Sequence, residues 1–194
     1  MDSALDPRLL LALASGIVIA ATCGLRAFLP LLALGAAARF DLLRLAPSME
    51  WLASDIALVA LGAATVAELA ADKIPLLDHA LDVVGAVVRP LAAVFGSYVV
   101  LQGWPAPWGA LIALALGGLA LGVQGAKAKA RIGSTAISLG HANPVLSVFE
   151  DVLAFVGTVL AILLPALALA LTALGLWLIF GRRRARGAAP RARA

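Results

Sequence analysis

Four carboxylates and two cations lie close together between residues 68 and 90, beside segments apolar enough to cross a membrane. The acids are Glu68, Asp72, Asp78 and Asp82, and the cations are Lys73 and Arg89. Ionisable side chains at membrane depth are costly unless they pair, line water or bind a ligand. Glu68 and Asp72 are one helical turn apart, so their charges repel and one of them can hold a proton. The stretch therefore indicates a site that binds an ion or relays protons.

A second pair of acids, Glu150 and Asp151, lies in a later apolar segment. Cations also occur in or beside apolar segments, at Arg26, Lys127 and Arg131. We expect these cations, together with those of the first stretch, to tune the charge of the acids, and we expect acids from both halves of the chain to meet at one membrane face. In the alternative interpretation, the charges pair only to lock the helices together.

Composition places these residues in a membrane protein. Hydrophobic residues make up 63% of the 194-residue chain and charged residues only 13%, whereas soluble domains contain roughly 25% charged residues. Six of the fifteen basic residues lie in the last thirteen positions, and without them nine basic residues face eleven acidic ones. No basic patch interleaved with aromatics occurs, so we expect no nucleic-acid partner. The single cysteine, Cys23, excludes an internal disulfide.

The apolar segments predict an all-α, polytopic bundle. Residues 9–38 are too long for one crossing, because a straight helix of that length spans about 45 Å and the hydrocarbon core about 30 Å. Gly24 and Pro30 predict a break there. Residues 55–71, 75–101 and 109–125 predict three further spans. Pro75 suits the first position of a helix, and the basic cluster at 127–131 is expected to end the fourth span.

The second half repeats this combination of a long apolar segment with a break. Residues 145–180 are again too long for one span, and Pro165 either closes a hairpin or kinks one helix. Asn143 and Pro144 predict a second broken helix. Paired broken helices are how several transporters build a site at the membrane midplane. Residues 39–54 read as an amphipathic connector at the interface, and Gly118 and Gly122 have the spacing of closely packed helices or of a dimer contact.

Charge asymmetry predicts the topology. The positive-inside tendency places residues 127–131 and the arginine-rich end on the cytoplasmic side, which gives about six spans with both termini cytoplasmic in the inner membrane. Residues 1–181 then form one transmembrane domain, and 182–194 form a disordered basic tail that lies on anionic lipid headgroups. The oligomeric state stays open.

Three blocks of the sequence resemble one family. They are GLRAFLPLL at 24–32, ELAADKIPLLD through RP at 68–90, and KAKAR with the T-x-x-S-x-G-x-x-NP-x-x-S-x-x-ED run at 127–151. Together they resemble a family of bacterial integral membrane proteins known as domain of unknown function 4126. The resemblance implies a multi-spanning protein of the inner membrane. It implies no activity, substrate or catalytic residue.

Enzymatic chemistry finds less support in the motifs. Asp78-x-x-x-Asp82 is similar to the last acids of CDP-alcohol phosphotransferases, but the Asp-Gly-x-x-Ala-Arg block that precedes them there is missing. No nucleophile elbow, phosphate loop or H-E-x-x-H helix occurs. His79 and His141 among the acids could join an oxygen-rich site for Mg²⁺, Ca²⁺ or Mn²⁺. Separated histidines are more often satisfied polar residues or helix caps than ligands, so no metal or cofactor is expected. The hypothesis is a transporter or channel-like permease for an ion or small polar solute; the alternative is a structural protein, or one that docks partners or lipids.

Overall fold

The computed structural model of the chain describes residues 6–71, 75–138 and 143–187, with side chains described over 6–71, 84–134, 145–175 and at 177. Across these residues the chain forms seven α-helices and one 3-10 helix, and no strand. Four of the helices are long and apolar enough to cross a membrane. The all-α membrane fold expected from the sequence is confirmed.

The helices follow one another with short connections. They are α1 (Pro7–Leu25), α2 (Phe28–Arg39), the 3-10 helix η2 (Pro47–Ala53), α3 (Asp55–Ala71), α4 (Pro75–Leu101), α5 (Trp108–Ser138), α6 (Asn143–Leu163) and α7 (Pro165–Gly187). Several of them begin with proline, which loses no hydrogen bond at a first position. At the start of α1, the Asp6 side chain also accepts a hydrogen bond from the backbone N–H of Arg8 at 2.8 Å.

The described helices provide four or five candidate crossings, close to the expected number of about six. The four candidate spans are Pro7–Leu25, Val84–Leu101, Trp108–Ser134 and Val145–Leu163. A fifth results if η2 and α3, which bend by 58° where they meet, form one span. The helix α2 and the Pro165–Gly175 part of α7 are apolar but shorter. The expected count is therefore approximate.

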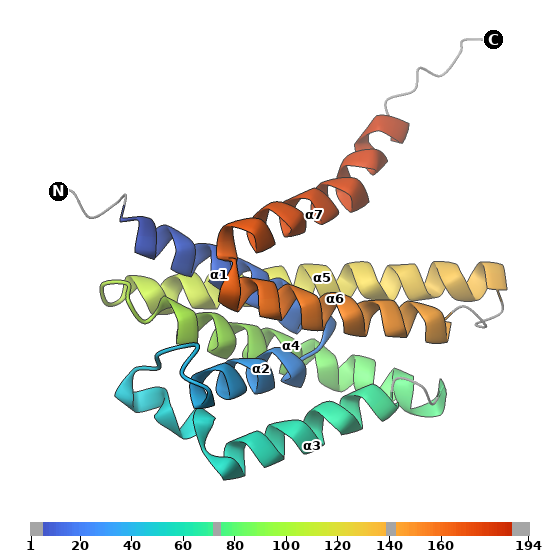
Figure 1. Cartoon of the computed structure of the whole chain (residues 1–194). Helices are drawn as coiled ribbons and strands as arrows, with labels where there is room; N and C mark the ends of the chain where they lie inside the picture. The colour runs from blue at the N-terminus through green and yellow to red at the C-terminus, as the bar shows by residue number, and fades with distance from the viewer. Residues whose placement is uncertain (1–5, 72–74, 139–142, 188–194) are drawn as a thin grey trace.

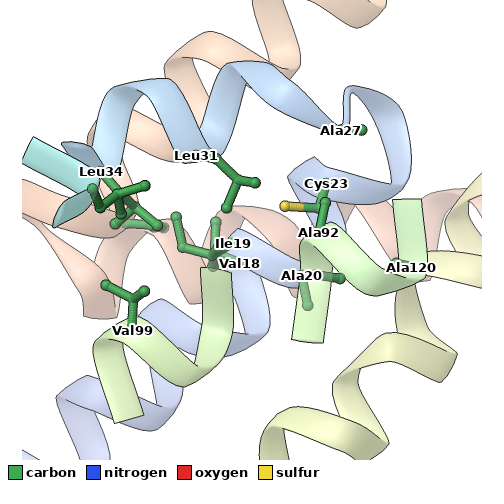
Figure 2. Packing of buried hydrophobic residues seen from close by; sticks show 14 residues of the cluster. Val18, Ile19, Ala20, Cys23, Ala27, Leu31, Leu34, Ala92, Val99 and Ala120 are labelled. Carbon is green, nitrogen blue, oxygen red and sulfur yellow. The ribbon is translucent and has the colours of Figure 1, made fainter. Parts of the chain in front are cut away.

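Helix α1 lies at the centre of the bundle, where it packs against α4, α5, α6 and α7. Figure 1 shows α4, α5 and α6 running alongside it, α2 and α3 on one side, and α7 leaning away from the other helices. Buried residues of α1, α2 and α4, such as Ile19, Leu34 and Val99, form the core (Figure 2). Large apolar side chains such as Ile56 and Leu114 face outward, as expected for helices surrounded by lipid.

The expected interruption of the first apolar segment is present. Helix α1 ends at Leu25, Arg26 has an extended backbone (φ −137°, ψ 121°), and α2 begins at Phe28. The break comes just after Gly24, and Pro30 lies in the first turn of α2. The second expected interruption, at Asn143 and Pro144, coincides with the start of α6, and residues 139–142 lie outside the described residues.

One expectation about the fourth span is wrong. The basic cluster at 127–131 does not end the helix, because α5 continues to Ser138 and buries Lys127 and Arg131. The buried cations face acids of another helix, which the local sequence does not reveal. An added Cβ at Gly118 or Gly122 would meet nothing within 4 Å, so their small size is not needed for packing against the described helices, and a dimer contact stays a prediction. Gly117 packs instead, since its Cβ would lie 2.7 Å from Val94.

The remaining segments agree largely with the expected ones. Helix α4 begins at Pro75 and ends at Leu101 with Pro90 inside it. The 3-10 helix η2 occupies the connector between α2 and α3, and Trp51 there is exposed. Helices α6 and α7 meet at Leu164, beside Pro165, so residues 145–180 contain two helices. Helix α7 extends to Gly187, which is past residue 182, where the disordered tail was expected to begin, and residues 188–194 lie outside the described part.

Candidate functional site

The site is built around residues 25–28, called here the α1–α2 interruption. A break in a helix leaves carbonyl groups without partners on one side and N–H groups on the other. The carbonyl oxygen of Leu25 accepts a hydrogen bond from Lys127 Nζ at 3.4 Å. On the opposite side, the carboxylate of Glu68 accepts from the N–H of Ala27 at 3.0 Å and of Phe28 at 3.3 Å.

The signs of these two charges fit the ends that they contact. A helix favours a cation at its C-terminus, where carbonyls carry partial negative charge, and an anion at its N-terminus. Lys127 reaches the C-terminus of α1, and Glu68 reaches the N-terminus of α2. Both side chains are buried, so little water weakens the interaction. Charged side chains from α5 and α3 thus stabilise the two helix ends at the interruption.

Arg26 lies in the interruption itself and is fully buried. Its Nη2 forms an ion pair with the Asp151 carboxylate and donates a hydrogen bond to Ser147 Oγ at 3.0 Å. Ser147 and Asp151 are one turn apart on α6, so both can face the same guanidinium. The arginine therefore ties the extended segment between α1 and α2 to α6.

Three buried side chains, Lys127, Arg131 and Glu150, form the Glu150 cluster between α5 and α6. Glu150 Oε2 lies 3.0 Å from Lys127 Nζ and 3.2 Å from Arg131 Nη2. The two cations are four residues apart on α5, which places them on the same face. Because Lys127 also reaches Leu25, this cluster is connected directly to the interruption.

The fourth contact is looser than the others. Arg89 Nε of α4 lies 3.9 Å from Glu68 Oε1 of α3, and the side chains are 2% and 8% exposed. This distance allows an ion pair but no hydrogen bond. A cavity of about 320 Å³ adjoins both residues, and the other described residues that line it are Ala, Val, Gly and Phe. We call it the Arg89 cavity.

Comparison with known families gives the following result. The sequence model described as "Domain of unknown function (DUF4126)" matches residues 13–184. The chain belongs to this family. The match includes every residue of the site just described, and the family's description states no activity. No curated protein and no solved structure is detectably similar to the chain.

The structure brings together several of the residues that the sequence predicts to form the site. Arg26 lies in the interruption, and Glu68, Asp151 and Lys127 contact it directly. Arg89 is linked to it through Glu68, Glu150 through Lys127, and Arg131 through Glu150. Glu68 lines the Arg89 cavity, whereas Glu150 pairs with cations of α5 on the other side of the interruption. Asp72 and Lys73 lie outside the described residues, and so do the side chains of Asp78, His79 and Asp82. His141 also lies outside them.

Sequence reasoning missed the polar partners that carry no charge. Ser147 binds Arg26, and Thr158 Oγ1 donates to Thr22 Oγ1 at 3.2 Å between α6 and α1. The positions of Ser147, Asp151 and Thr158 at helical spacing on α6 were a usable signal. The backbone groups at Leu25, Ala27 and Phe28 gave none, because the side chains of these residues do not indicate which groups their backbone atoms bond.

Replacing Gly24 by alanine should destabilise the interruption. An added Cβ there would lie 2.7 Å from the Ala120 carbonyl oxygen and 2.8 Å from Val123 Cβ, so α1 must move away from α5. Overpacking of this kind costs about 1–3 kcal/mol. Thermal unfolding in detergent measures the loss. The control is Gly118→Ala, which meets nothing within 4 Å and should not destabilise; equal melting temperatures of the two variants would contradict the close packing.

Proposed function

We propose that this protein is a small membrane transporter or channel-like permease for an ion or small polar solute. The observation that carries the proposal is the α1–α2 interruption, flanked on both sides by buried charged side chains. In transporters, broken helices place their partial charges and unpaired backbone groups at the solute site. Glu68, Glu150 and Asp151 are the described acids that would bind the solute or couple its passage to protons.

The energetic cost of this arrangement supports the proposal. Removing several charged groups from water is expensive, and buried ion pairs often stabilise a fold no more than apolar residues would. Packing alone does not require an arginine at the break between two helices, or a carboxylate at the N-terminus of the second helix. A functional requirement for charge accounts for their position.

The loose contact between Glu68 and Arg89 further supports a site that changes state. Glu68 already accepts two backbone hydrogen bonds, and Arg89 lies beyond hydrogen-bond distance of its Oε1. The Arg89 cavity lies beside the pair and is in the size range of small-molecule sites. Binding of a solute could draw the two side chains together or apart without unfolding a helix.

Replacement of Glu68 by glutamine should abolish flux. The substitution keeps the shape and a hydrogen-bond acceptor but removes the charge. Protein in liposomes loaded with a pH-sensitive dye is challenged with gradients of K⁺, Na⁺ and H⁺, and light scattering follows urea and glycerol. The matched control is Asp55→Asn at the other end of α3, where the side chain is 82% exposed and pairs with Arg39.

The results separate the possible roles of Glu68. Flux in the wild type and in Asp55→Asn, lost in Glu68→Gln, supports the proposal. Flux that is equal in all three proteins rejects Glu68 as part of the pathway. The melting temperature of each variant is measured in parallel, so that a folding defect is not mistaken for loss of transport.

A second candidate is a non-transporting protein whose charges lock the helices or form a docking face for lipids or partners. The Glu150 cluster favours it, because Glu150 is closely paired with Lys127 and Arg131. It predicts that solutes cross liposomes with wild-type protein no faster than empty liposomes, while Glu68→Gln lowers thermal stability.

The proposal also includes the location of the protein. It places the protein in the inner membrane, with both termini cytoplasmic and residues 182–194 on anionic lipid headgroups.

A further inference from the structure

The guanidinium of Arg89 has donors without acceptors. Its side chain is 2% exposed, and both Nε and Nη1 are buried with no hydrogen-bond partner among the residues described. The Glu68 oxygen at 3.9 Å from Nε is too distant to bond. A buried donor left unpaired destabilises a fold. The position is therefore poor for stability alone and suited to a ligand that supplies acceptors.

Helix α4 makes room for this guanidinium. Gly85 lies one turn before Arg89, and a Cβ at Gly85 would come within 3.2 Å of Arg89 Cζ and 3.3 Å of its Nη1. Those contacts are tighter than most real ones, so a larger residue would press on the guanidinium. Glycine inside a helix is less favourable than alanine. The space that it leaves allows the arginine to lie flat against its own helix at the cavity.

The Arg89 cavity determines what else the ligand must carry. Among the described residues that line its about 320 Å³, the ionisable ones are Glu68 and Arg89. The walls include Phe28, Ala64, Val84 and Val88. Such walls favour an apolar body of a few carbon atoms. One guanidinium in an apolar cavity fits a ligand with one oxyanion and little other polarity.

The negative charge of Glu68 does not prevent an anion from binding nearby. Both of its oxygens accept N–H groups at the N-terminus of α2, so the partial positive charge of that helix end offsets it. An arriving oxyanion meets Arg89, whose Nε and Nη1 have no hydrogen-bond partner among the described residues. Glu68 fixes that helix end in place while the guanidinium bonds the ligand.

We propose that the Arg89 cavity binds an oxyanion carried on an apolar body, through hydrogen bonds from the Arg89 guanidinium. As an identification of the transported solute, this assignment rests on the proposed function; as a binding site it can be tested without flux. The same chemistry is offered by a short-chain carboxylate dissolved in water and by the phosphate of an anionic lipid. The experiment distinguishes these two sources.

The binding experiment uses the full chain in nanodiscs of phosphatidylcholine. Butyrate is titrated while thermal unfolding and calorimetry follow binding, and butyramide serves as the neutral isostere. Butyrate should raise the melting temperature and butyramide should not. Arg89→Gln should weaken butyrate binding at least tenfold, and Arg89→Lys should retain part of it. The control Arg39→Gln removes an exposed cation and should leave binding unchanged.

A second variant distinguishes loss of binding from a folding defect caused by replacing Arg89. Gly85→Ala keeps every charge but presses on the guanidinium, and it should weaken butyrate binding severalfold in a protein that still unfolds cooperatively. Nanodiscs that contain phosphatidic acid form the lipid arm. If only these stabilise the wild type relative to Arg89→Gln, the oxyanion comes from lipid.

Each outcome bears on one proposal or the other. Butyrate binding that depends on Arg89, in a protein that carries neither the solutes of the flux experiment nor butyrate itself, supports the site and rejects transport. Flux that depends on Glu68, with neither butyrate nor phosphatidic acid distinguishing wild type from Arg89→Gln, supports transport and overturns this assignment. Equal stabilisation by butyrate and butyramide also overturns it, because the charge of the oxyanion would then play no part.

Discussion

Replacement of Glu150 by glutamine is expected to lower the free energy of unfolding by about 3–5 kcal/mol. The wild-type carboxylate lies 3.0 Å from Lys127 Nζ and 3.2 Å from Arg131 Nη2, and all three side chains are buried. A neutral amide leaves two buried cations close together without the charge that offsets their repulsion. Unfolding of the purified protein in mixed detergent micelles measures the loss.

Two further variants test whether electrostatics causes this loss. Adding Lys127→Met to Glu150→Gln removes one of the two cations and should restore part of the stability. Asp55→Asn breaks an exposed pair, with 53% and 82% of the Arg39 and Asp55 side chains accessible, and should cost about 1 kcal/mol or less. A Glu150→Gln variant no less stable than Asp55→Asn would show that the cluster contributes little to the fold.

Replacement of Arg26 by methionine should cost about 3 kcal/mol, because it leaves the partly buried Asp151 without its cation. The guanidinium is fully buried, pairs with Asp151 and donates to Ser147 Oγ at 3.0 Å. Methionine fills a similar volume, so the change acts mainly through charge and hydrogen bonding. Thermal unfolding of wild type and variant in the same detergent gives the difference.

A double-mutant cycle isolates the pair from other effects of removing Arg26. The cycle combines Arg26→Met with Asp151→Asn and compares the sum of the single losses with the double loss. A coupling energy of about 1–3 kcal/mol is expected for two groups in contact. Additive losses would mean that Arg26 and Asp151 do not stabilise each other, and that the interruption is held by Lys127 and Glu68 instead.

Local sequence signals were sufficient for most of the helix boundaries. Pro75 and Pro165 begin helices because proline lacks the N–H that an internal position needs. The break after Gly24 followed from the length of the apolar segment, which exceeds the membrane thickness. These features depend on a few neighbouring residues and on the dimensions of the bilayer, so they can be inferred from one sequence.

The partners within the site could not be inferred in the same way. Lys127 and Arg131 were expected to end a span, but α5 continues past them because Glu150 of α6 offsets their charge. Glu68 was expected to act beside Asp72, yet its described bonds go to backbone groups at Ala27 and Phe28. Which faces of two helices meet depends on the packing of the whole bundle, and periodicity within one helix does not specify it.

The central position of α1 has a consequence for how the protein is made. Ribosomes deliver the N-terminal residues first, so Arg26 leaves the ribosome long before Ser147, which lies 121 positions later. Until α6 follows, that guanidinium has neither the hydroxyl nor the Asp151 carboxylate to bond. The break between α1 and α2 therefore reaches its final form late in biogenesis, and a chain that stops before α6 retains an arginine that no carboxylate from α6 neutralises.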